Sequence, residues 1–263
     1  MARLTIFIPT RGRVGDQKTL DKWKLKDAPF DVVVVVPKCE RKAQKKALPS
    51  FVSDIVTVPD EYRFPQIRQF IMETFEGSHL LLDDDLVPFR RMDGTTKLRN
   101  PTDEQFVELW DELDNLSDLY AHGAISAREG NNHVLEDMVE NSRAMRAHFY
   151  DSAVMRETKL KFTDSRIKED FHSTLWMLTR GYENCVLYKW AQNQSGSNTA
   201  GGCSRYRTDR LMTEDAHALH NMYPDFVTVV QKTTKSSWGG GTRTDVRIQW
   251  KKAFQSSQGK SPC

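Results

Sequence analysis

The stretch Asp31–Pro37, DVVVVVP, decides the fold class of this 263-residue chain. Its five consecutive valines are β-branched and favour a strand, but they cannot alternate between a buried and an exposed face. Both faces of the strand must therefore be covered, as in a parallel sheet that carries helices on its two sides. The run predicts a central strand of an α/β fold.

Strands and helices alternate on both sides of the valine run. The predicted order is strand 4–9, helix 16–27, strand 31–37, helix 39–48, strand 54–58, helix 66–75 and strand 78–82. Right-handed crossovers of this kind build a doubly wound, mainly parallel sheet. Ligands of such sheets bind at the carboxyl ends of the strands, so the residues that follow each strand are the first candidates for a site.

The pattern becomes less regular after Pro88. We expect helices at 100–119 and 171–178, strands at 123–127 and 227–230, an extended stretch at 146–155, a polar loop at 193–203 and a basic, glycine-rich loop at 232–244. The length of the chain fits one domain over residues 1–254. The polar residues 255–263 are expected to form a disordered tail.

Composition excludes several classes of protein. Apolar residues make up 38% of the chain and charged residues 28%, and the formal net charge is only +2. Binding of nucleic acid by bulk positive charge is therefore not indicated. No stretch approaches the roughly 20 apolar residues of a membrane helix. The four cysteines have neither a CxxC pair nor zinc-ligand spacing. These features predict a reduced, cytoplasmic protein without a membrane partner.

Three acids, Asp83, Asp84 and Asp85, follow strand 78–82 directly. Adjacent carboxylates at the end of a buried strand repel one another and lose hydration, and a bound cation offsets both costs. In an extended chain, positions 83 and 85 point the same way and can share one divalent ion. The motif therefore predicts a magnesium or manganese site that holds a diphosphate. The alternative is an acidic turn that caps the next element.

The first strand ends in a second distinctive segment, IPTRGR at residues 8–13. Pro9 stops the strand, while arginines such as Arg11 and Arg13 pair with phosphate or stack on a base. A solvated basic loop is the simpler explanation of this segment alone. The chain has no GxGxxG and no GxxxxGK[ST] motif, which disfavours both a Rossmann dehydrogenase and a P-loop NTPase.

The order of these motifs resembles that of the GT-A glycosyltransferases. The resemblance covers roughly residues 3 to 190 and rests on IPTRGR, the valine strand, VPD at 58–60, LLLDDDL at 80–86 and FYDSAVMRETKLKFTDSRIKEDFHSTLWMLTRGY at 149–182. Within this superfamily, IPTRGR and KEDFHSTLWMLTRG are most similar to the TET/JBP-associated glycosyltransferases, phage and eukaryotic proteins thought to add sugars to hydroxymethylated pyrimidines in DNA. The resemblance implies a GT-A-like domain with a nucleotide-sugar half at about 1–90 and an irregular acceptor half at 91–254.

The resemblance also assigns roles to individual positions. It implies a divalent cation, Mn²⁺ or Mg²⁺, on Asp83 and Asp85. Glu169 and Asp170 match a pair in which one carboxylate is the general base of inverting enzymes, although acids at a helix start are also favoured by the helix dipole alone. The donor is a nucleoside-diphosphate sugar, expected to be UDP-linked. The residues expected to contact it are Pro9, Thr10, Arg11, Arg13, Asp60, Arg68 and Asp84.

Basic residues in the second half suggest further contacts. A cationic, glycine-rich lid with Lys232 and Lys235 would close over the donor diphosphate, and a surface hairpin explains the same residues equally well. The residues expected to contact DNA are Arg90, Arg91, His172 and Arg205.

The sequence thus predicts a metal-dependent glycosyltransferase, inverting and phage-encoded, that acts on a hydroxyl of a hydroxymethylated pyrimidine in DNA in the host cytoplasm. Two alternatives remain open. One is a glycosyltransferase with a protein or glycan acceptor. The other is a non-catalytic module that binds a nucleotide or nucleic acid, against which the intact Asp83, Asp85 and Asp170 argue.

Overall fold

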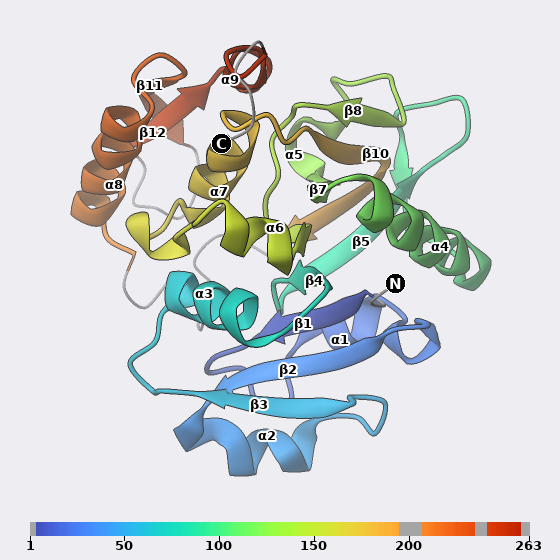
Figure 1. The fold of residues 1–263 in the computed structure, drawn as a ribbon. Helices are drawn as coiled ribbons and strands as arrows, with labels where there is room; N and C mark the ends of the chain where they lie inside the picture. Colours follow the sequence, from blue (N-terminus) through green and yellow to red (C-terminus); the bar gives the residue numbers. More distant parts are fainter. Residues whose placement is uncertain (1–3, 195–206, 235–240, 259–263) are drawn as a thin grey trace.

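A large sheet with helices on both faces forms the body of the molecule (Figure 1). The computed structural model describes residues 4–194, 207–234 and 241–258. The strand order in the sheet is β3 (Asp54–Val58), β2 (Asp31–Pro37), β1 (Thr5–Pro9), β4 (Ser78–Leu82), β9 (Ala147–Asp151), β7 (His122–Ala127), β10 (Asn184–Gln194), β5 (Leu86–Arg91) and β6 (Leu98–Arg99), with β8 (Met138–Glu140) paired to β10. The α/β fold class predicted from the sequence is confirmed.

The first four strands are parallel, as predicted. β1 lies between β2 and β4, and β2 also pairs with β3, all in parallel register. Beyond β4 the sheet becomes mixed: β9 is antiparallel to both β4 and β7, whereas β7 and β10 are parallel. The second half therefore continues the same sheet and is more regular than the sequence suggested.

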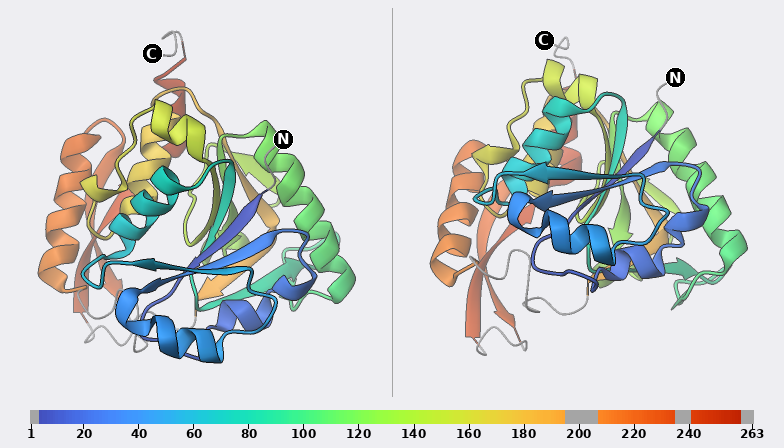
Figure 2. Two further views of the ribbon diagram at one scale, coloured as in Figure 1. Left: turned by 60° about the horizontal axis from the view of Figure 1, so that its bottom comes forward. Right: turned by 90° about the horizontal axis from the view of Figure 1, so that it is seen from below.

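The valine strand is buried on both faces. Val32, Val34 and Val36 belong to an apolar cluster with helix α4 (Asp103–Leu119). Val33 and Val35 belong to a second cluster, formed with helix α3 (Phe64–Thr74). Figure 2 shows the strands between α4 on one side and α3 on the other. The prediction that both faces of this strand are covered is confirmed.

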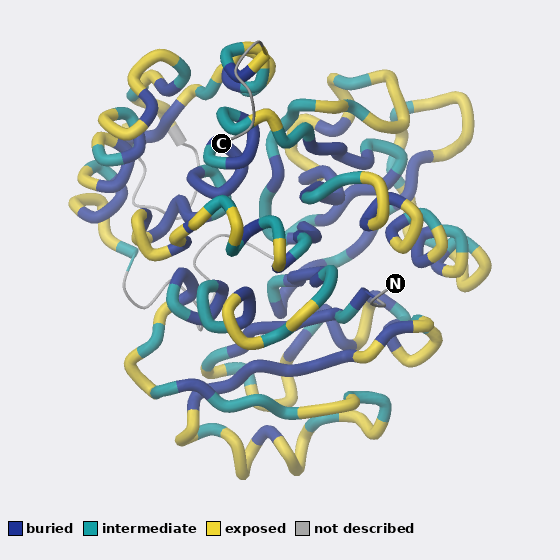
Figure 3. The backbone as a smooth tube through the Cα atoms, in the orientation of Figure 1, coloured by how far each residue is buried: buried dark blue, intermediate teal, exposed yellow. Residues whose placement is uncertain are grey.

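The remaining helices have between four and fourteen residues, and α8 is the longest of them. They are α1 (Lys18–Lys22), α2 (Arg41–Ala47), α5 (Arg128–Asn131), α6 (Ser152–Glu157), α7 (Glu169–Leu178), α8 (Asp209–Met222) and α9 (Trp250–Gln255), with 3₁₀ turns η1 (Leu25–Asp27), η2 (Lys38–Glu40) and η3 (Phe162–Asp164). In Figure 3 the inner strands are buried, whereas α2 is largely exposed.

Two predicted elements were wrong in part. Helix 16–27 is split into α1 and η1. The predicted extended stretch 146–155 is strand β9 followed by α6, because the Asp151 side chain accepts hydrogen bonds from the amides of Ala153 and Val154 and so caps a helix. The sequence analysis missed strand β10 altogether.

Helix α8, strands β11 (Val227–Thr234) and β12 (Gly241–Ile248) and helix α9 form what we call the C-terminal unit. The two strands pair antiparallel with each other and extend over most of the predicted basic loop. Apolar residues of the unit pack against Leu175 and Leu178 of α7.

The predicted disordered tail starts too early. Gln255 ends α9, and Ser257 is buried, with its hydroxyl donating to the carbonyl of Phe254. The rest of that tail and most of the predicted polar loop lie outside the described residues. One domain over residues 1–254 stays a prediction. None of the helices in the described ranges is long and apolar enough to cross a membrane.

Candidate active site

The loops that follow β1, β2 and β3 are tied to one another at the carboxyl ends of the strands. The Arg11 guanidinium donates a hydrogen bond from Nη1 to the carbonyl of Tyr62 at 2.9 Å. The backbone amide of Gly12 donates to both carboxylate oxygens of Glu40, each at 2.9 Å. These contacts join three neighbouring loops, so the rim of the sheet is organised before any ligand binds.

Asp60 belongs to the same rim. It is exposed, and its Oδ1 accepts a hydrogen bond from the backbone amide of Cys39 at 2.9 Å. That hydrogen bond lowers the pKa of the Asp60 carboxyl, and the nearby Arg11 charge lowers it further. Asp60 therefore carries a negative charge at the rim, in the position predicted for a contact with the nucleotide.

The three acids after β4 occupy a turn, because β5 begins at Leu86, only four residues after the end of β4. The expectation that Asp83 and Asp85 point the same way from an extended backbone is therefore wrong. Asp83 faces Arg68 at 3.4 Å between Oδ1 and Nη2. Asp84 and Asp85 both face Arg13, which lies 3.0 Å from Oδ2 of Asp85.

Burial makes these acids costly to ionise. Loss of hydration raises the pKa of Asp83 to about 7 and that of Asp84 to about 6, although the charges of Arg68 and Arg13 act in the opposite direction. Asp84 is 1% exposed and accepts a hydrogen bond from the Thr10 hydroxyl. Thr10 and Asp84 thus hold the β1 loop to the acidic turn, and their contact with the donor stays a prediction.

The acidic turn fits a divalent cation whose coordination is completed by the substrate. Oδ1 of Asp85 is buried and has no hydrogen-bond partner among the described residues, while Oδ2 also accepts from Gln194 Nε2 at 3.0 Å. Carboxylate oxygens suit Mg²⁺ and Mn²⁺. Within the described ranges no three acidic, histidine or cysteine side chains gather to hold a metal. Phosphate and water oxygens would have to supply the remaining ligands.

Arg68 connects this turn to the second half of the molecule. It lies on α3 and is only 3% exposed. Its Nη2 is 3.4 Å from Asp83, and its Nε is 3.6 Å from Oε1 of Glu169, the first residue of α7. One buried guanidinium therefore joins the acidic turn to the pair Glu169 and Asp170, although the two are at least 84 residues apart in the sequence.

Glu169 and Asp170 have different surroundings. Glu169 is 7% exposed, and burial raises its pKa to about 7 against the opposing charge of Arg68. Asp170 is only half-buried, and its Oδ1 accepts from the amide of Phe171 at 2.9 Å. No ion pair to Asp170 forms within the described part of the chain. Its carboxylate is thus more exposed than that of Glu169.

A further pair of hydroxyls fixes the head of α7. The Ser173 hydroxyl donates to the Asp170 carbonyl at 3.0 Å and lies 3.2 Å from the Tyr150 hydroxyl on β9. Tyr150 was not singled out from the sequence. Its position within the aromatic strand FYD was the only signal for it.

A family model of TET-associated glycosyltransferases matches residues 4–202. The chain belongs to this family. It is 25% identical, over 239 residues, to the Beta-glucosyl-HMC-alpha-glucosyl-transferases of Enterobacteria phages T6 and T2, with 84% of this chain and 82% of each relative covered. The predicted family and enzyme class are therefore confirmed: the protein is a glycosyltransferase.

Solved structures resemble this glycosyltransferase only distantly. GalNAc-T7, solved with UDP, GalNAc and Mn²⁺, gives a TM-score of 0.47 at 7% identity and covers 73% of this chain and 43% of that one. The 4-diphosphocytidyl-2C-methyl-D-erythritol synthase of Anaerococcus prevotii gives 0.45 at 12% identity, with 82% and 96% covered.

The two arginines expected at the acceptor are engaged within the glycosyltransferase itself. Arg90 pairs with Asp93 at 2.8 Å and with Glu108 at 3.3 Å. Arg91 is buried and donates to the side chain of Asn131 and to backbone carbonyls of the segment 131–136. Both guanidiniums therefore have partners within the fold, and their contact with DNA stays a prediction.

Of the other predicted contacts, His172 and Lys232 have partners within the protein, and the other two are not described. His172 is 1% exposed, lies 3.0 Å from the Tyr223 hydroxyl through Nδ1, and has its pKa lowered by burial, so it stands in the core as a neutral ring. Lys232 pairs with Asp245 at 2.9 Å. Arg205 and Lys235 lie outside the described residues.

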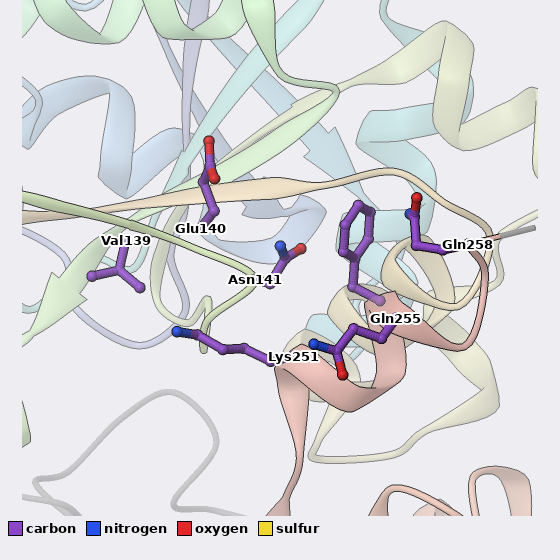
Figure 4. Close-up of a pocket in the computed structure, with 7 residues that line it drawn as sticks. Val139, Glu140, Asn141, Lys251, Gln255 and Gln258 are labelled. Atoms are coloured by element: carbon purple, nitrogen blue, oxygen red, sulfur yellow. The ribbon is translucent and has the colours of Figure 1, made fainter.

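A separate cavity of about 400 Å³ lies between β8 and α9. Figure 4 shows the side chains that line it. They are Val139, Glu140, Asn141, Lys251, Phe254, Gln255 and Gln258. None of the predicted site residues is among them, so the candidate active site is distinct from this cavity.

Proposed function

We propose that this glycosyltransferase moves a sugar from a UDP-linked donor to a hydroxyl on a hydroxymethylated pyrimidine of DNA. Family membership gives the class of reaction. The phage relatives, whose name describes an alpha-glucosyl-transferase and beta-glucosyl-HMC, support an acceptor built on HMC and a phage source. A phage-encoded enzyme of this kind acts in the cytoplasm of the infected cell.

The observation that carries the proposal is the position of Arg68. The Arg68 side chain lies 3.4 Å from Asp83 and 3.6 Å from Glu169, so the acidic turn and the start of α7 lie on either side of one guanidinium. A sugar whose diphosphate lies at the acidic turn would then present its anomeric carbon toward α7. This proximity is what transfer between a donor and an acceptor requires.

On the donor side, we assign the nucleotide to the rim of the sheet. The charged Asp60 and the Arg11 loop border this rim, while Arg13 neutralises charge in the acidic turn. Asp83 and Asp85 would hold Mn²⁺ or Mg²⁺. When bound, the cation stabilises the negative charge that develops on the departing diphosphate.

On the acceptor side, Asp170 is the better candidate for the general base. Glu169 is held by Arg68, whereas the Asp170 carboxylate is more accessible. In this mechanism Asp170 takes the proton of the acceptor hydroxyl as its oxygen bonds to the anomeric carbon, and the bond from that carbon to the diphosphate oxygen breaks. Attack opposite the leaving group inverts the anomeric configuration. For a base stacked in a duplex, reaching this site requires extrusion of the nucleotide.

Mass spectrometry of nucleosides tests the proposal. The enzyme is incubated with hydroxymethylated DNA, Mn²⁺ and a panel of nucleotide sugars, with unmodified DNA of the same sequence as the control. We expect one sugar to be added to the modified pyrimidine and none to the control DNA. Hydrolysis of the donor without transfer would move the acceptor to a protein or glycan. Neither transfer nor hydrolysis would favour a non-catalytic binding module.

A further inference from the structure

The loop before α7 is held by a carboxylate of the C-terminal unit. Asp215 lies on α8 and is 1% exposed. Its Oδ2 accepts hydrogen bonds from the Ser165 hydroxyl at 2.9 Å and from the amides of Ile167 and Lys168, both at 3.0 Å. Its Oδ1 accepts from the amide of Arg166 at 2.9 Å. Four donors from four consecutive residues thus converge on one buried side chain.

The chemistry of this contact requires a carboxylate. An ionised carboxylate only accepts hydrogen bonds, and here it faces three backbone amides and a hydroxyl. The N-cap of α7, Lys168, makes no side-chain capping hydrogen bond, so the start of the helix needs acceptors from elsewhere. A negative charge beside a helix N-terminus is also electrostatically favourable. Asp215 therefore accepts from the amide of the N-cap residue Lys168 and from the two amides before it, and so holds the segment that leads into α7.

Besides the exposed pair of Arg166 with Glu214, two buried contacts join the same loop to the C-terminal unit. Lys168, whose side chain is 6% exposed, places Nζ 3.6 Å from Oδ1 of Asp245 on β12. Ile167 packs in an apolar cluster with Leu211 and Met212 of α8. The loop is therefore fixed by hydrogen bonds, by charge and by apolar packing, and all three come from residues beyond position 206.

We propose that Asp215 is a positioning residue for glycosyl transfer. By fixing residues 165–168, it sets the orientation of the first turn of α7 and with it the carboxylate of Asp170. This inference rests on the proposed function, in which Asp170 takes the acceptor proton. The family model ends at residue 202. The C-terminal unit thus contributes to the reaction from outside the matched segment.

Asp215→Asn tests the inference, because the amide nitrogen it introduces would face backbone N–H groups. A displacement of the base of about 1 Å lowers the rate by about 100-fold, so we expect kcat to fall by at least about 30-fold. The donor Kd and the KM for DNA should stay within about twofold of wild type. Glu214→Gln is the matched control, since Glu214 is its neighbour on α8 and pairs only with the side chains of Arg166 and Arg210 in the described structure. It should keep the wild-type kcat.

Ser165→Ala removes one of the four hydrogen bonds to Asp215, together with the bond that the Ser165 hydroxyl accepts from the Lys168 amide at 3.1 Å, and it decides the question if Asp215→Asn does not fold. We expect its kcat to fall several-fold at an unchanged donor Kd. Wild-type kcat in the folded variant, or a loss of donor affinity equal to the loss of kcat, overturns the inference. Asp170→Asn is measured in parallel. If Asp170→Asn retains transfer, the proposed base is wrong. If it is inactive while the Asp215 and Ser165 variants are fully active, only the positioning role of Asp215 is wrong.

Discussion

The two sides of the site are positioned by different means. On the donor side, Arg11, Asp60 and Asp83 closely follow parallel strands and are placed by the strands that precede them, while Arg68 lies on helix α3. On the acceptor side, Asp170 is the second residue of helix α7, and the loop before this helix is held by Asp215, from a part of the chain that is distant in sequence. Donor-side residues are therefore predictable from local pattern, whereas the acceptor side depends on tertiary contacts.

Removing Arg68, which links the two sides, should have the largest effect on stability and on transfer. Arg68→Met leaves the partly buried Asp83 and the buried Glu169 without their shared positive charge. Breaking a buried ion pair in this way costs about 3–5 kcal/mol, so we expect a clear fall in the free energy of unfolding and a loss of transfer of at least about 100-fold. Urea denaturation and single-turnover assays measure the two effects. Arg68→Lys is the control that keeps the charge, and equal stability of Arg68→Met and wild type would contradict the account.

A change in the sheet should lower stability without separating the two sides. A methyl group at Gly123 on β7 would lie 2.4 Å from the ring of Phe149 and 2.7 Å from the carbonyl oxygen of Cys185. We expect Gly123→Ala to lower the free energy of unfolding by about 2–3 kcal/mol through overpacking. Gly241→Ala, where the methyl group would meet open space, is the matched control. Equal melting temperatures for the two variants would show that the β7–β9 contact is looser than described.

Neutralising Asp83 on the donor side should change the free energy of unfolding in a pH-dependent way. The pKa of Asp83 is higher in the folded protein, at about 7, than its ordinary value of 3.8, so the native state binds more protons between these values. Asp83 therefore lowers the stability of the metal-free protein progressively as pH rises from about 4 to 7. Asp83→Asn removes this penalty.

We expect Asp83→Asn to gain roughly 1–2 kcal/mol relative to wild type between pH 5 and pH 8, after allowance for solvent screening. Thermal unfolding of both proteins across this range, in the presence of a chelator, measures the difference. Saturating Mn²⁺ should stabilise the wild type more than the variant at pH 8. If the difference in stability between wild type and Asp83→Asn were the same at every pH in this range, the pKa of Asp83 would not be raised.

The smallest effect is expected from a substitution on the surface of the C-terminal unit, and it is measured on donor binding. Lys232 is half-exposed and shares Asp245 with Lys168 and Arg243. Because exposed ion pairs contribute little, Lys232→Gln should change the donor Kd by less than about threefold. Isothermal titration with UDP and Mn²⁺ measures this. A loss of donor affinity of tenfold or more would restore Lys232 to the diphosphate site predicted from the sequence.

The sequence allowed the first half of the fold to be predicted closely. The valine run required two covered faces, and strands β1 to β4 lie within one residue of their predicted bounds. The acidic turn was found because charges directly follow a buried strand. The geometry of the acidic turn was not predicted. It depends on the tight turn into β5 and on the contact with Arg13, and both are tertiary features.

The second half was predicted less well because its determinants are distant in sequence. Arg90 and Arg91 are basic residues close to the acidic turn in sequence, but the sheet directs them toward Glu108 and Asn131. Asp215 gives no local signal at all, since a single acid on an amphipathic helix is ordinarily exposed. Only the packing of α8 beside the loop before α7 reveals its role.

The division of the site into two sides is tested most directly by comparing donor binding with transfer in two variants. Asp85→Ala alters the acidic turn, and Asp170→Asn alters the head of α7. Binding of UDP is measured by isothermal titration with and without Mn²⁺, and transfer to hydroxymethylated DNA is measured with the same preparations. We predict that Asp85→Ala loses the Mn²⁺-dependent part of donor binding. Asp170→Asn should bind donor as the wild type does but lose transfer by about 100-fold or more. Retained Mn²⁺-dependent binding in Asp85→Ala, or normal transfer by Asp170→Asn, would contradict the account.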